Sequence, residues 1–317
     1  MSQGAAVGPS TVVRAVFFGS GSFAVPILDA LVAQPGIAVE AVVSAPDRPV
    51  GRKAMLTPTA VAMRARELGL AMLQPVRVRA PEAVAALTAL APDLIVLADY
   101  GQLIPRVLLD LPPRGFLNLH PSALPRHRGA APIPATILAG DTESAVTLLM
   151  VTEEMDAGPI VAVEPLDVRP DDTAVTLEER AATAAARLIA RALPEWLAGR
   201  LEACPQASEG VTVTRPLRRA NGLLHPRSPA IELERQVRAY QLWPGSYLET
   251  PQGRLIVWRA EVAPAVPGED RGRLVEAGGG LALTTAHGRL VLREVQLAGG
   301  RRMTSAEMLR GRPGLVL

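Results

Sequence analysis

Short apolar runs alternate with segments of helical periodicity over the first two hundred residues of the chain. The runs predict strands at 12–18, 37–43, 94–98, 116–120 and 145–151, and the segments between them predict helices at 23–33, 59–68, 81–90, 132–139 and 173–193. Thr173 is a suitable N-cap for the last of these helices. This alternation is typical of a sheet with crossover helices, so we predict a doubly wound, mostly parallel, Rossmann-like α/β domain over 12–193.

The pattern changes after Pro194. A linker at 194–212 leads to a short helix at 231–240, and alternating strands follow at 255–263, 281–285 and 290–295. Several short strands separated by glycine-containing turns predict a small OB-like β-barrel over 213–317. Tyr240, Leu242 and Trp243 are expected to pack the helix against this barrel. Residues 1–11 carry no pattern and are expected to form a disordered leader.

Composition narrows the class of protein. The 317 residues are 49% hydrophobic, which is enough for two folded domains. No stretch approaches the roughly 18 apolar residues of a membrane span, and the N-terminus does not resemble a secretory signal, so we expect a cytoplasmic protein without membrane contact. Cys204 is the single cysteine, which excludes an internal disulfide and a cysteine-built metal site. We expect a monomer.

The charge is unevenly distributed. Residues 1–205 contain 17 Arg or Lys and 21 Asp or Glu, a net charge of −4, whereas residues 206–317 contain 16 and 10, a net charge of +6. A basic second half favours contact with a polyanion such as a nucleic acid. An arginine-rich coding bias is the alternative, since Lys53 is the only lysine.

The segment from Asn118 to Pro132 carries the strongest chemical signal. Asn118 and His120 lie two residues apart at the end of a predicted strand, so their side chains share a face, at the carboxyl end where such sheets bind ligands. Asp156, in a Met-Asp-Ala-Gly loop after another strand, can face His120. A metal site would need further ligands that the sequence does not offer, and Ser122 lacks the surroundings of a hydrolase nucleophile.

Two further motifs have plainer interpretations. Gly19-Ser-Gly21-Ser-Phe23 resembles half of a dinucleotide fingerprint, but the third glycine is absent, which favours a tight strand-to-helix turn. His127 lies between two arginines and is expected at the surface or in contact with a substrate.

The chain resembles the methionyl-tRNA formyltransferase family over nearly its whole length. The resemblance is carried by 17–26, 46–53, Leu56-Thr-Pro58, 118–132, 155–158 and 239–244. The Asn-x-His pair and the distant Asp are shared by folate-dependent formyltransferases generally. The basic loop after Pro46 and the Trp-Pro segment favour the tRNA enzyme. The resemblance implies transfer of a formyl group from 10-formyltetrahydrofolate to the methionine of initiator Met-tRNA, with no metal.

The resemblance also implies roles for Asn118, His120 and Asp156 as the catalytic residues. Asn118 and His120 would stabilise the oxyanion of a tetrahedral intermediate, because both can donate a hydrogen bond. Asp156 would either orient the imidazole and favour its charged form, or accept a proton through water. The sequence does not choose between these.

By the same resemblance, loops around one central strand and before Asp156 form the folate pocket. The expected donor-site residues are Leu94, Ile95, Val96, Leu97, Ala98, Asp99, Tyr100, Ser122, Leu124, Pro125, Thr152, Glu153, Glu154 and Met155. The expected tRNA contacts are Arg48, Arg52 and Lys53 in the basic loop, and Arg215, Arg218, Arg219 and Arg254 in the second domain. Two alternatives remain open: a formyltransferase acting on a sugar nucleotide or other small amine, and a protein that binds folate or RNA without turnover.

Overall fold

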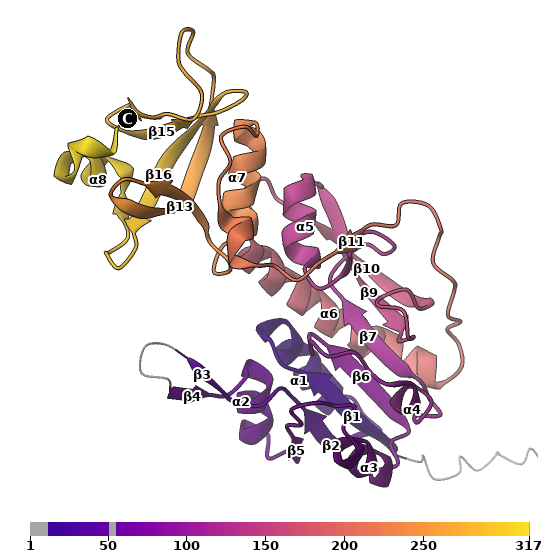
Figure 1. The fold of residues 1–317 in the computed structure, drawn as a ribbon. Helices are drawn as coiled ribbons and strands as arrows, with labels where there is room; N and C mark the ends of the chain where they lie inside the picture. Colours follow the sequence, from indigo (N-terminus) through magenta and orange to yellow (C-terminus); the bar gives the residue numbers. More distant parts are fainter. Residues whose placement is uncertain (1–11, 51–54, 317) are drawn as a thin grey trace, which may run out of the picture. The chain divides into compact units, whose positions relative to one another are not determined.

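The computed structural model describes residues 12–50 and 55–316, so the expected leader, Arg52 and Lys53 lie outside the described residues. The fold consists of two compact units (Figure 1). One comprises the chain up to 129 together with 144–166 and 178–213, and the other comprises 130–143, 167–177 and 214–317. The domain limits proposed from the sequence stay a prediction.

The first unit is built on a seven-stranded sheet of order β10-β9-β7-β6-β1-β2-β5. Its strands are β1 (Val13–Gly19), β2 (Ile37–Val43), β5 (Met72–Leu73), β6 (Leu94–Ala98), β7 (Phe116–His120), β9 (Glu143–Met150) and β10 (Ile160–Asp167). The pairs β1–β2, β1–β6, β2–β5 and β6–β7 are parallel, whereas β9 runs antiparallel to β7. The prediction of a mostly parallel α/β sheet is therefore confirmed.

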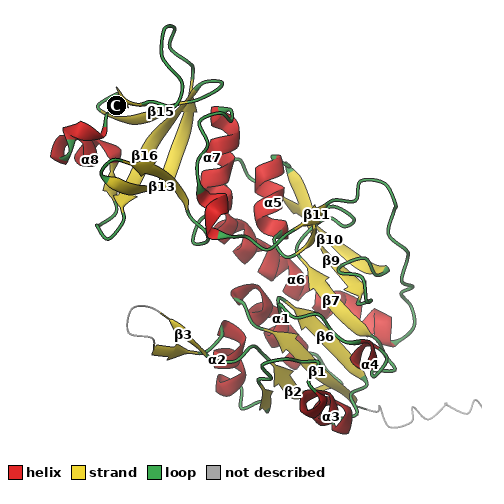
Figure 2. Cartoon of the chain, in the orientation of Figure 1, coloured by secondary structure: helices red, strands yellow, loops and turns green. Residues whose placement is uncertain are grey.

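Helices accompany this sheet (Figure 2). They are η1 (Ser22–Ala24), α1 (Val25–Val32), α2 (Ala60–Glu67), α3 (Pro81–Ala89), α4 (Arg106–Leu109) and α6 (Ala174–Leu197). Threonine side chains cap the N-termini of α2 and α6. Thr59 accepts from the Ala62 N–H, and Thr173 accepts from the Thr176 N–H. A small antiparallel pair, β3 (Arg48–Val50) and β4 (Met55–Thr57), precedes α2.

The strand order reverses at β1, which lies between β2 and β6. Strands β1 and β6 both end there, and the Ser20 N–H donates to the Asp99 carbonyl, 2.9 Å away. A Cβ at Gly21 would lie 1.7 Å from Asp99 Oδ2, so only glycine lets this carboxylate approach the turn. The expected strand-to-helix turn is present, and it lies at the point of the sheet where α/β proteins bind ligands.

The second unit contains a curled antiparallel sheet of order β12-β13-β16-β15-β14, with β17 paired to β16. Its elements are α5 (Pro132–Ala139), η2 (Arg219–Gly222), α7 (Ala230–Ala239), β12 (Ser246–Thr250), β13 (Gly253–Ala263), β14 (Leu274–Ala277), β15 (Gly280–Thr284), β16 (Arg289–Leu297), β17 (Met303–Thr304), α8 (Ser305–Gly311) and η3 (Pro313–Leu315), whereas β11 (Val213–Thr214) has one residue in each unit. Leu233 and Val237 of α7 join the strand residues Leu255, Leu283 and Leu292 in one buried core. The prediction of a small barrel domain is confirmed.

The turn after α7 differs from expectation. Tyr240 is 8% exposed and packs as predicted, but Leu242 is 75% exposed and Trp243 is 52% exposed. The Gly245 N–H donates to the Tyr240 carbonyl and Leu242 is left-handed, with φ +69°. The chain therefore reverses in a tight turn whose tip points away from the core, and the prediction that Leu242 and Trp243 pack against the barrel is wrong.

Candidate active site

The candidate catalytic side chains come from two segments of the first unit. Asn118 and His120 belong to β7, whose last residue is followed by Pro121, and both are buried, at 8% and 5% exposure. Asp156 lies in the loop between β9 and β10. Because successive side chains alternate across a strand, Asn118 and His120 project from the same face.

The structure brings these three groups together. The Asn118 amide donates from Nδ2 to Asp156 Oδ1 over 3.1 Å, and His120 Nδ1 lies 3.5 Å from Asp156 Oδ2. A third donor is the Gly129 N–H, 2.8 Å from Oδ2. One carboxylate thus contacts an amide, an imidazole and a backbone N–H, and the arrangement can hold hydrogen-bond donors beside a reacting carbonyl.

The loop that carries Asp156 follows an antiparallel strand. In the antiparallel register Met150 pairs with Leu117 and Thr147 with His120, so β9 ends beside the start of β7. The loop begins at the opposite end of β7 from His120 and returns over Asn118. It does not project from a carboxyl end next to His120, because the direction of β9 is reversed.

Tight local geometry surrounds Asp156. Its φ of +52° is left-handed, a conformation that Asp adopts more readily than most residues. Two residues later, a Cβ on Gly158 would lie 1.8 Å from the Met150 carbonyl oxygen, so this position admits only glycine. The backbone on both sides of the carboxylate is therefore closely constrained.

The second ring nitrogen of His120 is also occupied. Nε2 lies 3.0 Å from the His127 carbonyl oxygen, and since a carbonyl can only accept, Nε2 carries the hydrogen. His127 is 6% exposed, so the expectation of a surface residue is wrong. Its backbone N–H donates to Thr212 Oγ1 over 2.7 Å, which turns the residue inward and presents its carbonyl to His120.

Apart from Asp99 and Tyr100, the expected donor-site residues fall into three groups. Leu94, Ile95, Val96 and Ala98 are fully buried in the sheet, with Leu97 partly buried, so β6 can offer a ligand only backbone groups at its end. Thr152, Glu153, Glu154 and Met155 form a largely exposed run before Asp156. Ser122 and Leu124 are buried and Pro125 is partly buried, and the Ser122 hydroxyl donates to the Arg126 carbonyl.

Tyr100 is part of the hydrophobic core. It is 4% exposed and meets Phe18 edge to face, with ring centroids 5.2 Å apart. Burial raises the pKa of its phenol to about 12, and the hydroxyl has no hydrogen-bond partner among the described residues. Its side chain therefore supports the sheet beneath the expected folate pocket.

Asp99 has an unusual environment at the end of β6. Leu97 pairs with Asn118, so the register places Asp99 level with His120. Its side chain reaches solvent, yet surrounding protein raises the pKa of the carboxyl, and the negative charge of Glu178 raises it further. A hydrogen bond from the Gly21 backbone opposes this rise. Asp99 thus adds negative charge at the edge of the sheet where His120 lies.

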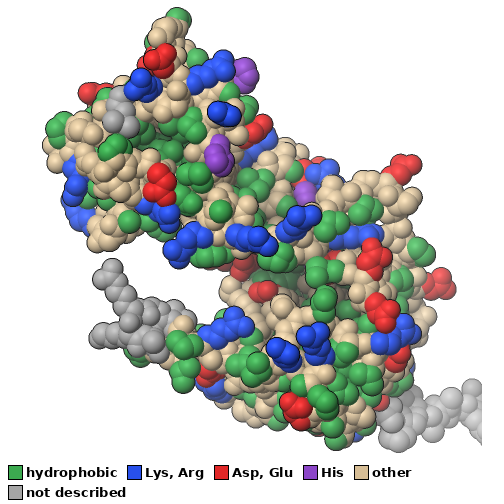
Figure 3. Space-filling model, viewed as in Figure 1, with side chains coloured by type: hydrophobic (Ala, Val, Ile, Leu, Met, Phe, Trp, Pro, Cys, Tyr) green, Lys and Arg blue, Asp and Glu red, His purple; other side chains and the backbone are tan. Residues whose placement is uncertain are grey.

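The expected tRNA contacts also differ among themselves. Arg48 is exposed in β3, and Arg215, Arg218 and Arg219 are exposed before α7. Arg254 instead bonds Glu249 through Nε and Nη2, and its guanidinium lies 4.1 Å from the centre of the Tyr247 ring. Figure 3 shows Arg side chains scattered over the visible face, with Asp and Glu among them.

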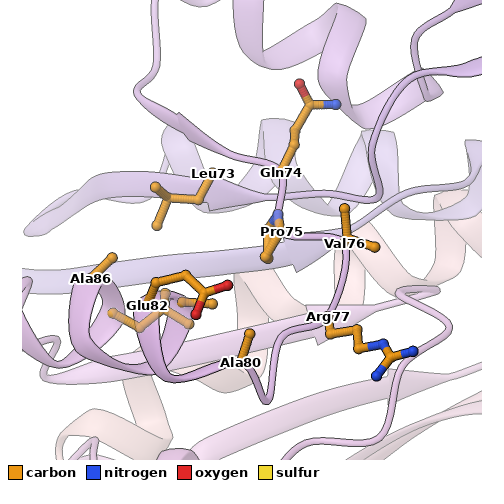
Figure 4. A pocket seen from close by; sticks show the side chains of 10 residues that line it. Leu73, Gln74, Pro75, Val76, Arg77, Ala80, Glu82 and Ala86 are labelled. Atoms are coloured by element: carbon orange, nitrogen blue, oxygen red, sulfur yellow. The ribbon is translucent and has the colours of Figure 1, made fainter.

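Two pockets lie away from the candidate catalytic side chains. One, of about 370 Å³, lies between the end of β5 and α3 and is lined by Leu73, Gln74, Pro75, Val76, Arg77 and neighbouring α3 residues (Figure 4). The other, of about 230 Å³, lies in the second unit between α5 and 214–221.

Among the described residues there is no cluster of three or more His, Cys, Asp or Glu suited to a metal. No helix in the same part of the chain is long and apolar enough to cross a membrane.

Sequence reasoning missed the residues that support the site from the linker. Gln206 bonds the backbone of the Asp156 loop, and Thr212 bonds the backbone of His127. Neither residue belongs to a recognisable motif, and each lies at least 48 residues from its partners in these loops, so no local signal could have identified it.

Comparison with known protein families identifies the family to which the chain belongs. A formyl transferase model matches residues 13–193, and a model of the formyl transferase C-terminal domain matches residues 216–313. The chain therefore belongs to the formyl transferase family. It is 42% identical over 300 residues to the methionyl-tRNA formyltransferase of Halorhodospira halophila, covering 94% of this chain and 96% of that one. It is 41% identical over 303 residues to the methionyl-tRNA formyltransferase of Chloroflexus aggregans, covering 94% and 97%.

Solved structures share the fold at low sequence identity. The sugar 3N-formyl transferase WlaRD is similar with a TM-score of 0.66 and 14% identity, covering 92% of this chain and 99% of that one. HypX from Aquifex aeolicus in complex with tetrahydrofolic acid has a TM-score of 0.60 and 17% identity, covering 94% and 47%.

Proposed function

We propose that this protein transfers the formyl group of 10-formyltetrahydrofolate to the amino group of methionine on initiator Met-tRNA, which yields formyl-Met-tRNA. The convergence of Asn118, His120 and Asp156 supports the chemistry. The full-length similarity to methionyl-tRNA formyltransferases supports the substrates. Because the product serves translation initiation, we also propose that the protein acts in the cytoplasm. A monomeric state is a separate proposal.

The reaction joins the amine nitrogen to the formyl carbon. Attack gives a tetrahedral species with an anionic oxygen, and the bond between that carbon and folate N10 then breaks. The amine nitrogen loses one proton and N10 gains one, so the reaction is balanced without an oxidant or a metal. The principal demand on the protein is to stabilise the transient oxyanion, and hydrogen-bond donors fixed in advance meet this demand.

Asn118 and His120 are suited to that demand. The Asn118 amide has two hydrogens, one of which is directed to Asp156, so the second can donate to the oxyanion. His120 Nδ1 faces the carboxylate, while Nε2 is directed to the His127 carbonyl. We propose that the substrate oxygen replaces one of these acceptors and accepts the hydrogen bond that His120 donates.

Asp156 is better suited to positioning the side chains of Asn118 and His120 than to accepting a proton through water. Its two oxygens contact Asn118, His120 and the Gly129 N–H. These contacts fix the amide and the ring relative to each other. Of the two roles left open by the sequence, we propose orientation of His120 and Asn118.

A formylation assay tests this function. Purified protein is incubated with 10-formyltetrahydrofolate and either initiator Met-tRNA, elongator Met-tRNA or small amines including an amino-sugar nucleotide, and formylated products are detected by mass spectrometry. We expect formyl-Met on initiator tRNA at the highest rate. Preferential formylation of the amino-sugar nucleotide would contradict the proposed acceptor while retaining the chemistry.

Alanine variants test the proposed catalytic residues in the same assay. Removal of one fixed oxyanion donor lowers turnover by roughly 10² to 10³, so we expect Asn118→Ala and His120→Ala to show at least this loss. Circular dichroism and thermal unfolding establish that the variants remain folded. Near wild-type turnover by His120→Ala would contradict the mechanism.

A further inference from the structure

The segment after α6 returns to the catalytic loops of the first unit. Cys204 and Ile160 exchange backbone hydrogen bonds of 2.7 and 2.8 Å, which brings the chain beside the start of β10. Further along, the Arg128 N–H donates to the Thr212 carbonyl over 2.9 Å. Between these two attachments lies Gln206, whose side chain is partly buried.

All hydrogen-bonding positions of the Gln206 amide are used. Nε2 donates to the carbonyls of Asp156 and Gly158, at 2.7 and 2.8 Å. Oε1 accepts from Nε and Nη2 of Arg128, at 3.0 and 2.8 Å. Carbonyl oxygens only accept and a guanidinium only donates, so the orientation of this amide is determined by its partners.

These four bonds connect the two loops that enclose the Asp156 carboxylate. On one side, Gln206 holds the carbonyls of Asp156 and Gly158, in the stretch where Asp156 is left-handed. On the other side, it holds Arg128, the residue before Gly129, whose N–H donates to Asp156 Oδ2. A shift of either loop would change the distance from Asp156 to His120 Nδ1.

We propose that Gln206 is a positioning residue for formyl transfer, acting through Asp156. This inference rests on the proposed function. Gln206 fixes the Asp156 loop against Arg128, so that the carboxylate keeps Asn118 and His120 in the orientation needed to stabilise the oxyanion. It does not itself contact the reacting atoms.

Gln206→Glu tests this role with little change in volume. Glutamate still accepts from Arg128 but no longer donates to the two carbonyls, and its oxygen is repelled by theirs. A displacement of about 1 Å can lower a rate by 10²-fold, so we expect kcat for Met-tRNA to fall roughly 10- to 100-fold while KM for Met-tRNA and for the folate changes less than about twofold. Gln206→Ala provides a second variant if the first does not fold, and Glu209→Gln, an exposed neighbour in the same segment, is the control.

Hydrogen exchange detected by mass spectrometry supplies a readout that does not depend on activity. We expect Gln206→Glu to accelerate exchange in peptides covering 151–159, with unchanged exchange in peptides from β13 and β16 and no change in Glu209→Gln. Unaltered exchange over 151–159, or a wild-type kcat in both Gln206 variants, would overturn the inference. Failure of the wild-type protein to formylate Met-tRNA would instead contradict the proposed function and leave the exchange result to decide the role of Gln206.

Discussion

Two aspartates at the edge of the sheet where the candidate active site lies have left-handed backbones. Asp99 has φ +47° and Asp156 has φ +52°, and each lies beside a glycine that has no room for a Cβ. Gly21 allows the Asp99 carboxylate to approach the turn after β1, and Gly158 allows the Asp156 loop to pass the Met150 carbonyl. At this scale, the site depends on where side chains are absent as well as on where they are present.

Asp99 leads to a prediction about stability and pH. Its pKa is raised in the folded protein, so the folded state binds protons more readily than the unfolded state, and stability falls as pH rises above the ordinary value of 3.8 and through the raised value. Asp99→Asn removes this penalty and keeps a side chain that tolerates the left-handed backbone. We expect the variant to be more stable than wild type at pH 7, by a margin that shrinks as the pH is lowered.

Urea unfolding at several pH values from 4 to 7 measures this margin, because the change begins just above the ordinary pKa of 3.8. Glu209→Gln, which also removes one negative charge from an exposed position, serves as the control and should show little pH-dependent gain. A margin that grows on acidification would show that Asp99 is stabilising in its charged form, contrary to the environment described.

The sequence could predict only some of the site at the residue scale. Side chains alternate along a strand, so Asn118 and His120, which are two residues apart, lie on one face, and the sequence alone is enough to predict this. The contacts of Gln206 with Asp156 and of His127 with His120 depend on loops folding over one another. No periodicity encodes those approaches, so the sequence could not predict them.

At the scale of elements, most strands lie within a residue or two of their predicted limits, but the direction of β9 was not predictable. An apolar strand has the same pattern whether it runs parallel or antiparallel, and only its pairing distinguishes the two. The antiparallel direction of β9 determines that the following loop begins beside the start of β7.

Helix α6 extends past the proline at which a break was expected. Pro194 lies inside the helix, which continues to Leu197. The Trp196 indole N–H donates to the Arg114 carbonyl, and Arg114 Nη1 donates back to the Leu197 carbonyl. Tertiary bonds therefore hold the last turn, and a left-handed Gly199 follows the end of the helix.

The segment after α6 provides a prediction at this scale. Thr212→Val keeps the shape of the side chain but removes the oxygen that accepts from the His127 N–H. A buried N–H without a partner costs about 1 to 3 kcal/mol, and its movement would displace the carbonyl that faces His120. We expect lower stability in urea unfolding together with slower formyl transfer.

Thr214→Val is the matched control for this prediction. Thr214 Oγ1 accepts from the Ala131 N–H over 3.0 Å, a similar bond that does not involve His127. The control should lose stability without a comparable loss of kcat. Equal losses of kcat in both variants would show that the effect of Thr212 is general and does not act through His120.

At the scale of the whole molecule, the basic second half is only partly available to a polyanion. Arg254 is tied to Glu249 and Tyr247, whereas Arg215, Arg218 and Arg219 are exposed and have no carboxylate partner within the described parts of the chain. Net charge, read from the sequence, shows only that the second half of the chain is the more basic one, and its contact with a polyanion stays a prediction. It could not indicate which arginines are already paired.

This difference gives a prediction for tRNA binding. Substitution of Arg215, Arg218 and Arg219 by Glu should weaken the binding of Met-tRNA. It should also reduce the slope of log K against log salt concentration by about one per lost phosphate contact. Arg254→Gln should change the slope much less, because that guanidinium is engaged within the protein. Binding titrations at several salt concentrations measure both, and an unchanged slope in the triple variant would exclude these arginines from the interface.

The exposed thiol of Cys204 gives experimental access to the returning segment. It is the only cysteine, it is free, and it lies two residues before Gln206. A maleimide dye would therefore label a single known position in the natural sequence, without any background thiol to remove. Fluorescence from that dye would report changes in the environment of the segment as folate and then Met-tRNA are added.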